Sequence, residues 1–163
     1  MHDEAIIAME MEGRSDEALE LVRGGSGRSQ GTLWRAPLCH QQYGPPARLI
    51  HLVFLRVSQI NGCAHCIDLH TRDLLKTMPI DKIALLPVWD EVPHLFPDQY
   101  RAALAWAEEV TRVSETHASD EAYIAAAKAF EPKDLVDLTI AIAAMNAFNR
   151  LGAPFRLPVA AKP

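Results

Sequence analysis

The sequence lacks the features that mark several large classes of protein. Its 163 residues contain no apolar run of the ~20 residues that a membrane-spanning helix needs. Lys and Arg number 16 against 21 Asp and Glu, the net charge is −5, and no basic run predicts a nucleic-acid surface. The first residues, MHDEAIIAMEMEG, are acidic, whereas a signal peptide begins with basic residues. We therefore expect a cytoplasmic protein with neither a membrane nor a nucleic-acid partner.

Cysteine is scarce and its count is odd. Three cysteines do not build the disulfide framework of a small secreted protein. In a reducing compartment, two cysteines that lie close in sequence are more often catalytic or metal-binding than structural. The pair Cys63 and Cys66, separated by two residues, is therefore the first place to look for chemistry.

Strand patterns and internal repeats are also missing, and helical spacing takes their place. Residues 23–46 are rich in Gly, Ser, Pro and Gln, which predicts an irregular connector. The sequence predicts an all-α fold of six or seven helices in one domain spanning 1–163, with a divergent N-terminal segment over 1–46. The expected helices cover residues 16–23, 46–60, 63–78, 81–87, 97–113, 119–130 and 131–151.

The stretch NGCAHCIDLH concentrates two cysteines and two histidines. Its Asn-Gly pair predicts a helix stop, which would put Cys63 and Cys66 in the first turn of the next helix. At ~100° per residue, both cysteines and His70 then fall within about 60° of one another on one face.

A helix N-terminus stabilises a thiolate through its free N–H groups and its dipole. Cysteines of such a motif have pKa values of roughly 3.5 to 7.5, against about 8.5 for a free thiol. The thiolate is the nucleophile, a neighbouring thiol can resolve a sulfenic acid into a disulfide, and His70 can relay a proton. This pattern favours a dithiol peroxidase or reductase.

Three other interpretations compete with the redox hypothesis. Zinc could use Cys63, Cys66 and His70, with Cys39 or His51 as a fourth ligand, but no second ligand pair is present. Covalent haem requires a histidine directly after the second cysteine, which this chain lacks. The cysteines could also be buried and inert. We expect no cofactor and no resident metal.

The same residues resemble a known family. The stretch LVFLRVSQINGCAHCIDLHTRDLL is similar to the core motif of the alkyl hydroperoxidase D-like family, within the carboxymuconolactone decarboxylase superfamily. The likeness extends over about residues 47–156. It implies an all-helical protein that forms homo-oligomers, often trimers or hexamers. It also implies a thiol peroxidase that reduces organic hydroperoxides and is re-reduced by an external dithiol.

The resemblance assigns roles by position. It implies that Cys66 is the peroxidatic thiol, Cys63 the resolving thiol and His70 the proton-relay histidine. His65 matches a histidine that some members carry between the cysteines, although a solvent-facing position in the first helical turn is the preferred interpretation of it. Cys39 has no counterpart in the motif and is interpreted as a non-catalytic thiol.

One position departs from the family. Members that act as peroxidases typically carry Glu twelve residues before the first cysteine, and this chain has His51 there. A neutral His51 can accept a proton, a protonated one would stabilise a thiolate, and a core-lining role is the alternative. Two alternative functions stay open at this point. They are a lactone decarboxylase, whose branch characteristically lacks the cysteine pair, and a non-catalytic metal-binding oligomer.

Overall fold

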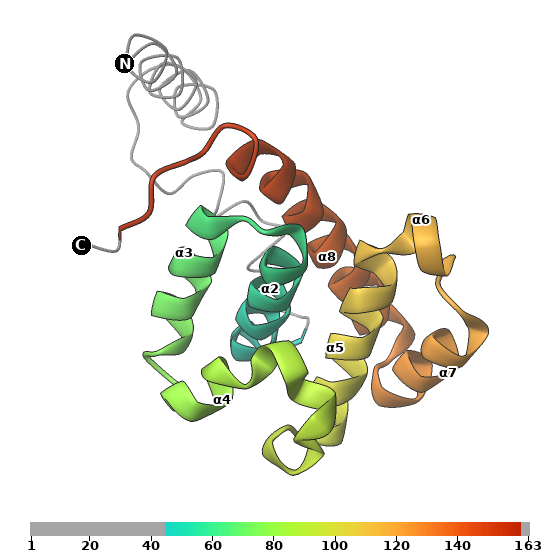
Figure 1. Ribbon diagram of the computed structural model, residues 1–163. Helices are drawn as coiled ribbons and strands as arrows, with labels where there is room; N and C mark the ends of the chain where they lie inside the picture. The colour runs from blue at the N-terminus through green and yellow to red at the C-terminus, as the bar shows by residue number, and fades with distance from the viewer. Residues whose placement is uncertain (1–44, 161–163) are drawn as a thin grey trace, which may run out of the picture.

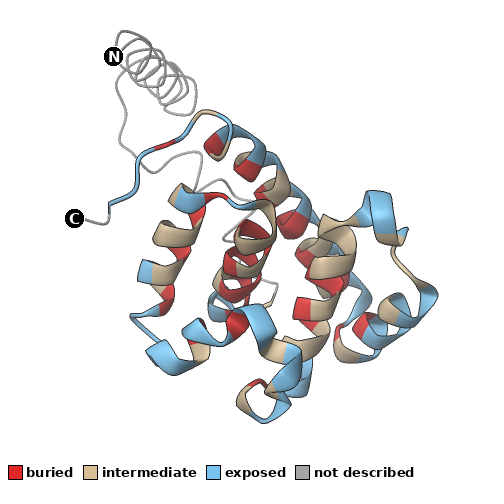
Figure 2. Ribbon diagram, viewed as in Figure 1, coloured by how far each residue is buried: buried red, intermediate tan, exposed pale blue. Residues whose placement is uncertain are grey.

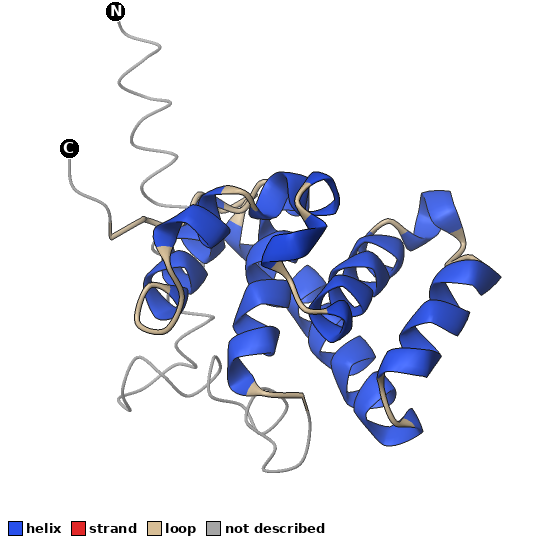
Figure 3. Cartoon of the chain, turned by 90° about the horizontal axis from the view of Figure 1, so that it is seen from below, coloured by secondary structure: helices blue, strands red, loops and turns tan. Residues whose placement is uncertain are grey.

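The computed structural model describes residues 45–160, and within this range the chain is helical without strands (Figure 3). The all-α prediction is therefore confirmed, while the predicted helix at 16–23 and Cys39 lie outside the described residues. None of the helices in residues 45–160 has the length and apolar character that crossing a membrane requires. The elements are α2 (Ala47–Asn61), α3 (Ala64–Leu74), α4 (Ile80–Ala84), the 3-10 helices η1 (Leu86–Glu91) and η2 (Pro93–Leu95), α5 (Asp98–Thr111), α6 (Val113–Thr116), α7 (Asp120–Ala129) and α8 (Pro132–Gly152).

Helix α2 lies at the centre, with α3 and α5 on either side of it and α8 packed across it (Figure 1). It separates two apolar clusters, because Leu49 and Val53 point into one and Leu52 and Leu55 into the other. Figure 2 shows buried residues along almost the whole of this helix. A helix that is apolar on most sides is a core element rather than a surface one.

The end of α2 follows from the Asn-Gly pair, as predicted. Gly62 adopts the left-handed conformation, with φ 66° and ψ 31°, that a residue without a Cβ reaches most easily. The Gly62 N–H donates to the Gln59 carbonyl at 3.3 Å and the Cys63 N–H donates to the Ser58 carbonyl at 3.0 Å. This pair of bonds is a Schellman motif, which closes α2 and turns the chain directly into α3.

The helix expected at 81–87 has different bounds in the structure. It is α4, which already ends at Ala84, and Pro87 is the second residue of the 3-10 helix η1 instead of stopping a helix. Proline is compatible with a first helical turn because the N–H that it lacks would be unsatisfied there. The predicted cap at Ser119 is confirmed, since its side chain accepts a hydrogen bond from the Ala122 N–H at 3.3 Å.

A polar cluster joins α2, η1 and α5. Glu108 of α5 accepts hydrogen bonds from Arg56 Nε at 2.7 Å and from Trp89 Nε1 at 2.8 Å. Arg112 Nη1 lies 3.3 Å from the other carboxylate oxygen. Burial alone would raise the pKa of Glu108, but these hydrogen bonds and the charges of Arg56 and Arg112 outweigh burial and hold the pKa below its ordinary value.

Candidate active site

Cys63 and Cys66 form a disulfide at the start of α3. Cys63 is the residue before the helix rather than part of its first turn, which corrects the predicted position by one residue. Its Sγ accepts a hydrogen bond from the Cys66 N–H at 3.4 Å, so the sulfur occupies the place of a helix-capping oxygen. Both cysteines are fully buried. In this bonded state the two sulfurs offer no thiolate to a zinc ion.

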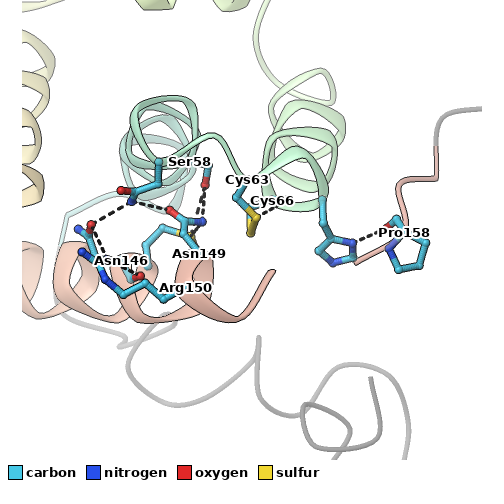
Figure 4. Close-up of a disulfide and its surroundings, with 10 residues drawn as sticks. Ser58, Cys63, Cys66, Asn146, Asn149, Arg150 and Pro158 are labelled. Atoms are coloured by element: carbon cyan, nitrogen blue, oxygen red, sulfur yellow. Dashed lines mark hydrogen bonds between the residues drawn. A yellow bond between two sulfur atoms is a disulfide. The ribbon is translucent and has the colours of Figure 1, made fainter. Parts of the chain in front are cut away.

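The last turn of helix α8 packs directly against the disulfide. A Cβ added to Gly152 would lie 2.7 Å from Cys63 Sγ and 3.4 Å from Cys66 Sγ, so only glycine allows this approach. Asn149, one turn earlier, is buried and donates to Ser58 Oγ at 3.1 Å, and it accepts from Asn61 Nδ2 at 2.9 Å (Figure 4). These bonds fix α8 against the end of α2 and bring Gly152 onto the disulfide.

The segment after α8 runs back over the start of α3. Leu157 is buried and lies within contact distance of a Cβ placed at Gly152. His65 Nδ1 donates to the Pro158 carbonyl at 2.6 Å, a bond visible in Figure 4. The Ala160 N–H donates to Asp68 Oδ2 at 2.8 Å. The structure thus places His65 in contact with the C-terminal segment.

His70 lies one helical turn after Cys66 and is only 4% exposed. Its ring packs against Phe54 of α2 with centroids 5.2 Å apart. Burial lowers the pKa of His70 to about 3, helped by nearby His51, while Asp73 opposes the shift. The imidazole is therefore neutral at physiological pH, and its Nε2 is buried with no hydrogen-bond partner among the described residues.

His51 of α2 meets His70 across the helix interface. Their Nδ1 atoms are 3.4 Å apart, and Asp73 Oδ2 lies 3.9 Å from His51 Nδ1. The other oxygen of Asp73 accepts a hydrogen bond from Lys76 Nζ at 2.6 Å. The structure thus brings the candidate residues His51 and His70 together, and it adds a carboxylate that the sequence analysis did not single out.

Comparisons with known proteins identify the family of the chain. A model of the carboxymuconolactone decarboxylase family matches residues 40–109. An uncharacterized protein of Bacillus subtilis (strain 168), YdfG, is 36% identical over 101 residues, which cover 61% of this chain and 68% of YdfG. The chain belongs to the carboxymuconolactone decarboxylase family.

Within this family the chain is AhpD-like. A crystal structure from Agrobacterium tumefaciens, of a protein of unknown function named as a candidate antioxidant defence protein AhpD, is 38% identical. The match covers 73% of this chain and 82% of that one, with a TM-score of 0.70. The structure has two features that the resemblance in the sequence led us to expect. They are an all-helical fold and a cysteine pair at the start of a core helix.

The sequence analysis missed two residues of this AhpD-like site. Asp73 follows His70 by three positions, so helical spacing places both on one face, but an acidic residue there also fits a solvated surface. Gly152 touches the disulfide from the last turn of α8 and lies outside the residues that the family model matches. The one sequence feature that could have marked Gly152 is its position at the end of a long apolar helix. A glycine there is equally typical of a helix stop.

Proposed function

We propose that the chain is a dithiol peroxidase that reduces organic hydroperoxides in antioxidant defence. The observation that carries this proposal is the Cys63–Cys66 disulfide at the start of α3, one turn before a buried neutral histidine. Two cysteines that already pair can store and release two electrons. The oxidant is an alkyl hydroperoxide and the electron donor is an external dithiol.

The reduced pair reacts in two steps. The Cys66 thiolate attacks the terminal peroxide oxygen, the O–O bond breaks, and the alkoxide leaves as an alcohol after taking up a proton. Cys66 is then a sulfenic acid, and Cys63 attacks its sulfur, which forms the disulfide and releases water. An external dithiol reduces this disulfide and is itself oxidised. Each cycle converts one hydroperoxide and one dithiol into one alcohol, one water and one disulfide.

Protons move through the histidines. His70 Nε2 is the ring atom without a partner in residues 45–160, and His70 lies one turn beyond Cys66, so it is the group to accept the Cys66 proton and return it to the alkoxide. His51, whose Nδ1 lies 3.4 Å from His70 Nδ1, orients the ring and exchanges the proton on that side. Asp73 of α3 supports His51, and Lys76, just after α3, donates a hydrogen bond to Asp73.

Peroxide consumption tests the proposal. We expect the purified protein to consume cumene hydroperoxide with dithiothreitol as donor, Cys66→Ser to lose turnover, and Cys39→Ser to keep it. The Cys63→Ser variant should still form one sulfenic acid, on Cys66, when it is treated with one equivalent of peroxide. Equal turnover by Cys66→Ser and the unaltered protein would overturn the mechanism.

The lactone decarboxylase alternative predicts a different dependence on these residues. A lyase that does not use thiol chemistry has no need of a reducible pair, so its activity would survive the Cys63→Ser/Cys66→Ser double substitution. The paired and buried sulfurs favour the peroxidase. By analogy with the resemblance, we also propose that the protein acts as a cytoplasmic homo-oligomer, a trimer or hexamer, which sedimentation analysis would test.

A further inference from the structure

Three potential metal ligands converge between α2 and α3. One atom each from His51, His70 and Asp73 lies within 4.8 Å of the others. The three residues combine two imidazole nitrogens with one carboxylate oxygen. The sulfurs of the zinc site considered from the sequence are not among these ligands, and only the histidines are common to both sets.

The distance between the two histidines, at the long end for a hydrogen bond, also fits a shared metal ion. Their Nδ1 atoms are 3.4 Å apart, which is longer than the 2.7–3.2 Å typical of N–H hydrogen bonds. Two nitrogens bound to one tetrahedral Zn²⁺ at 2.0–2.1 Å lie about 3.3–3.4 Å apart. The spacing of His51 and His70 therefore already equals one edge of such a site.

The carboxylate is positioned to complete the set. Asp73 Oδ2 faces His51 Nδ1 at 3.9 Å. A small rotation of the Asp73 side chain would shorten this distance to the about 3.3–3.4 Å that separates two ligand atoms of a tetrahedral zinc site. Asp73 Oδ1 accepts a hydrogen bond from Lys76 at 2.6 Å, which leaves Oδ2 directed at the histidines. A hydrogen bond to the second oxygen of a ligating carboxylate is the usual outer-shell support of a metal site.

The rings are held in place before any ion binds. Phe54 packs edge-on against His51, with centroids 6.5 Å apart, and against His70 at 5.2 Å. Phe54 is itself 3% exposed, so it is a fixed part of the core. His70 and Asp73 lie three residues apart on α3, which gives them one face of a rigid helix. Little conformational freedom remains to be lost on binding.

We propose that His51, His70 and Asp73 form a binding site for a divalent transition-metal ion of the Zn²⁺ type. Imidazole and carboxylate together suit Zn²⁺, Co²⁺, Ni²⁺ or Cu²⁺, whereas Mg²⁺ and Ca²⁺ take oxygen ligands. Three protein ligands leave at least one position of a four-coordinate ion to a ligand outside this set. The site lies beside the disulfide but is independent of its sulfurs.

The test uses the oxidised full chain carrying Cys39→Ser, so that no thiol competes for the metal. Co²⁺ is titrated and followed by its visible absorption, which is intense in tetrahedral sites, and Zn²⁺ is then added to displace it. We expect one Co²⁺ per chain. Asp73→Asn and His51→Ala should each weaken binding by about 100-fold, at or above the upper end of the 10–100-fold loss seen for outer-shell changes.

Two controls make the result decisive. His94→Ala removes an exposed histidine on η2 and should bind Co²⁺ as tightly as the parent protein. Asp73→Asn keeps the size of the side chain, and a circular dichroism spectrum equal to that of the parent protein shows that it folds. Absence of stoichiometric binding, or unchanged binding in both ligand variants, would overturn the site.

A bound ion would occupy His70 Nδ1 and hold His51, and so should inhibit peroxide turnover. This regulatory consequence rests on the proposed function, but the binding test does not. Co²⁺ binding without any peroxidase activity would contradict the proposed function and support the proposed metal site. Peroxidase activity without Co²⁺ binding would contradict the proposed metal site and support the proposed function.

Discussion

Gly152 lies against Cys63 so closely that a methyl group in place of its hydrogen would sit 2.7 Å from the Cys63 sulfur. The two residues belong to opposite ends of the described chain, and their contact packs the last turn of α8 onto the disulfide. The identity of residue 152 is therefore linked to the presence of the Cys63 sulfur.

Gly152→Ala should destabilise the oxidised protein by about 1–3 kcal/mol, the usual effect of an extra carbon in a packed core. In a Cys63→Ala/Cys66→Ala background the sulfurs are gone, and the same change should stabilise by about 0.5–1 kcal/mol because alanine favours a helix. Urea unfolding of the four proteins measures both values. The same sign in both backgrounds would contradict the contact.

Gly62→Ala should lower the free energy of unfolding by about 1–2 kcal/mol through backbone strain alone. The φ of 66° is unfavourable for residues with a Cβ, while no atom lies within 4 Å of where that Cβ would be. Gly62→Asn should cost less, because asparagine tolerates the left-handed region. Chemical denaturation compares the two variants, and an equal loss for both would point to a cause other than φ.

Glu108 should make the protein sensitive to acid. Its folded pKa lies below the ordinary value of 4.5, so the unfolded chain takes up the proton first as the pH falls. The stabilisation by its ion pairs is complete above that value and is lost as the pH falls through the lower, folded pKa.

The variant Glu108→Gln should lose about 1.5–3 kcal/mol at neutral pH, as expected for hydrogen bonds to a charged group. It should also show a shallower decline of stability in acid. Thermal unfolding from about pH 7 to about pH 3 measures both effects. Parallel pH profiles for the two proteins would show that Glu108 does not titrate differently in the folded state.

His51→Glu should raise peroxidase activity at neutral pH by about tenfold, a modest part of the 10²–10⁴-fold that a positioned acid or base contributes. A carboxylate at 51 would accept the N–H of His70 Nδ1 and leave Nε2 as the basic nitrogen of the ring. His51→Gln, of similar size but without the charge, is the control. Activity unchanged from about pH 5 to about pH 8 in His51→Glu would show that residue 51 is outside the relay.

Local patterns in the sequence predicted what lies within one turn of helix. The Asn-Gly stop, the cysteine spacing and His70 four residues later all depend on contacts between near neighbours, and the structure brings these residues together as expected. The one-residue error at Cys63 has the same origin, because a capping residue and a first-turn residue look alike in sequence.

Contacts between distant segments had no such signal. Nothing near Gly152 in the sequence indicates which face of an apolar helix meets the sulfurs. Asp73 and Asp68 are both acidic residues on α3, yet Asp73 lies near His51 while Asp68 pairs with Arg72 at 2.9 Å. Only the packing of α3 against α2 distinguishes the two, and packing is a property of the whole fold.

The packing of the last turn of α8 against the buried disulfide has a kinetic consequence. Because both sulfurs are buried, a reductant in solution reaches them only after the residues packed around them move apart. At high dithiol concentration the rate of reduction should stop rising and equal the rate of that opening, so that every sufficiently concentrated reductant gives the same limiting rate.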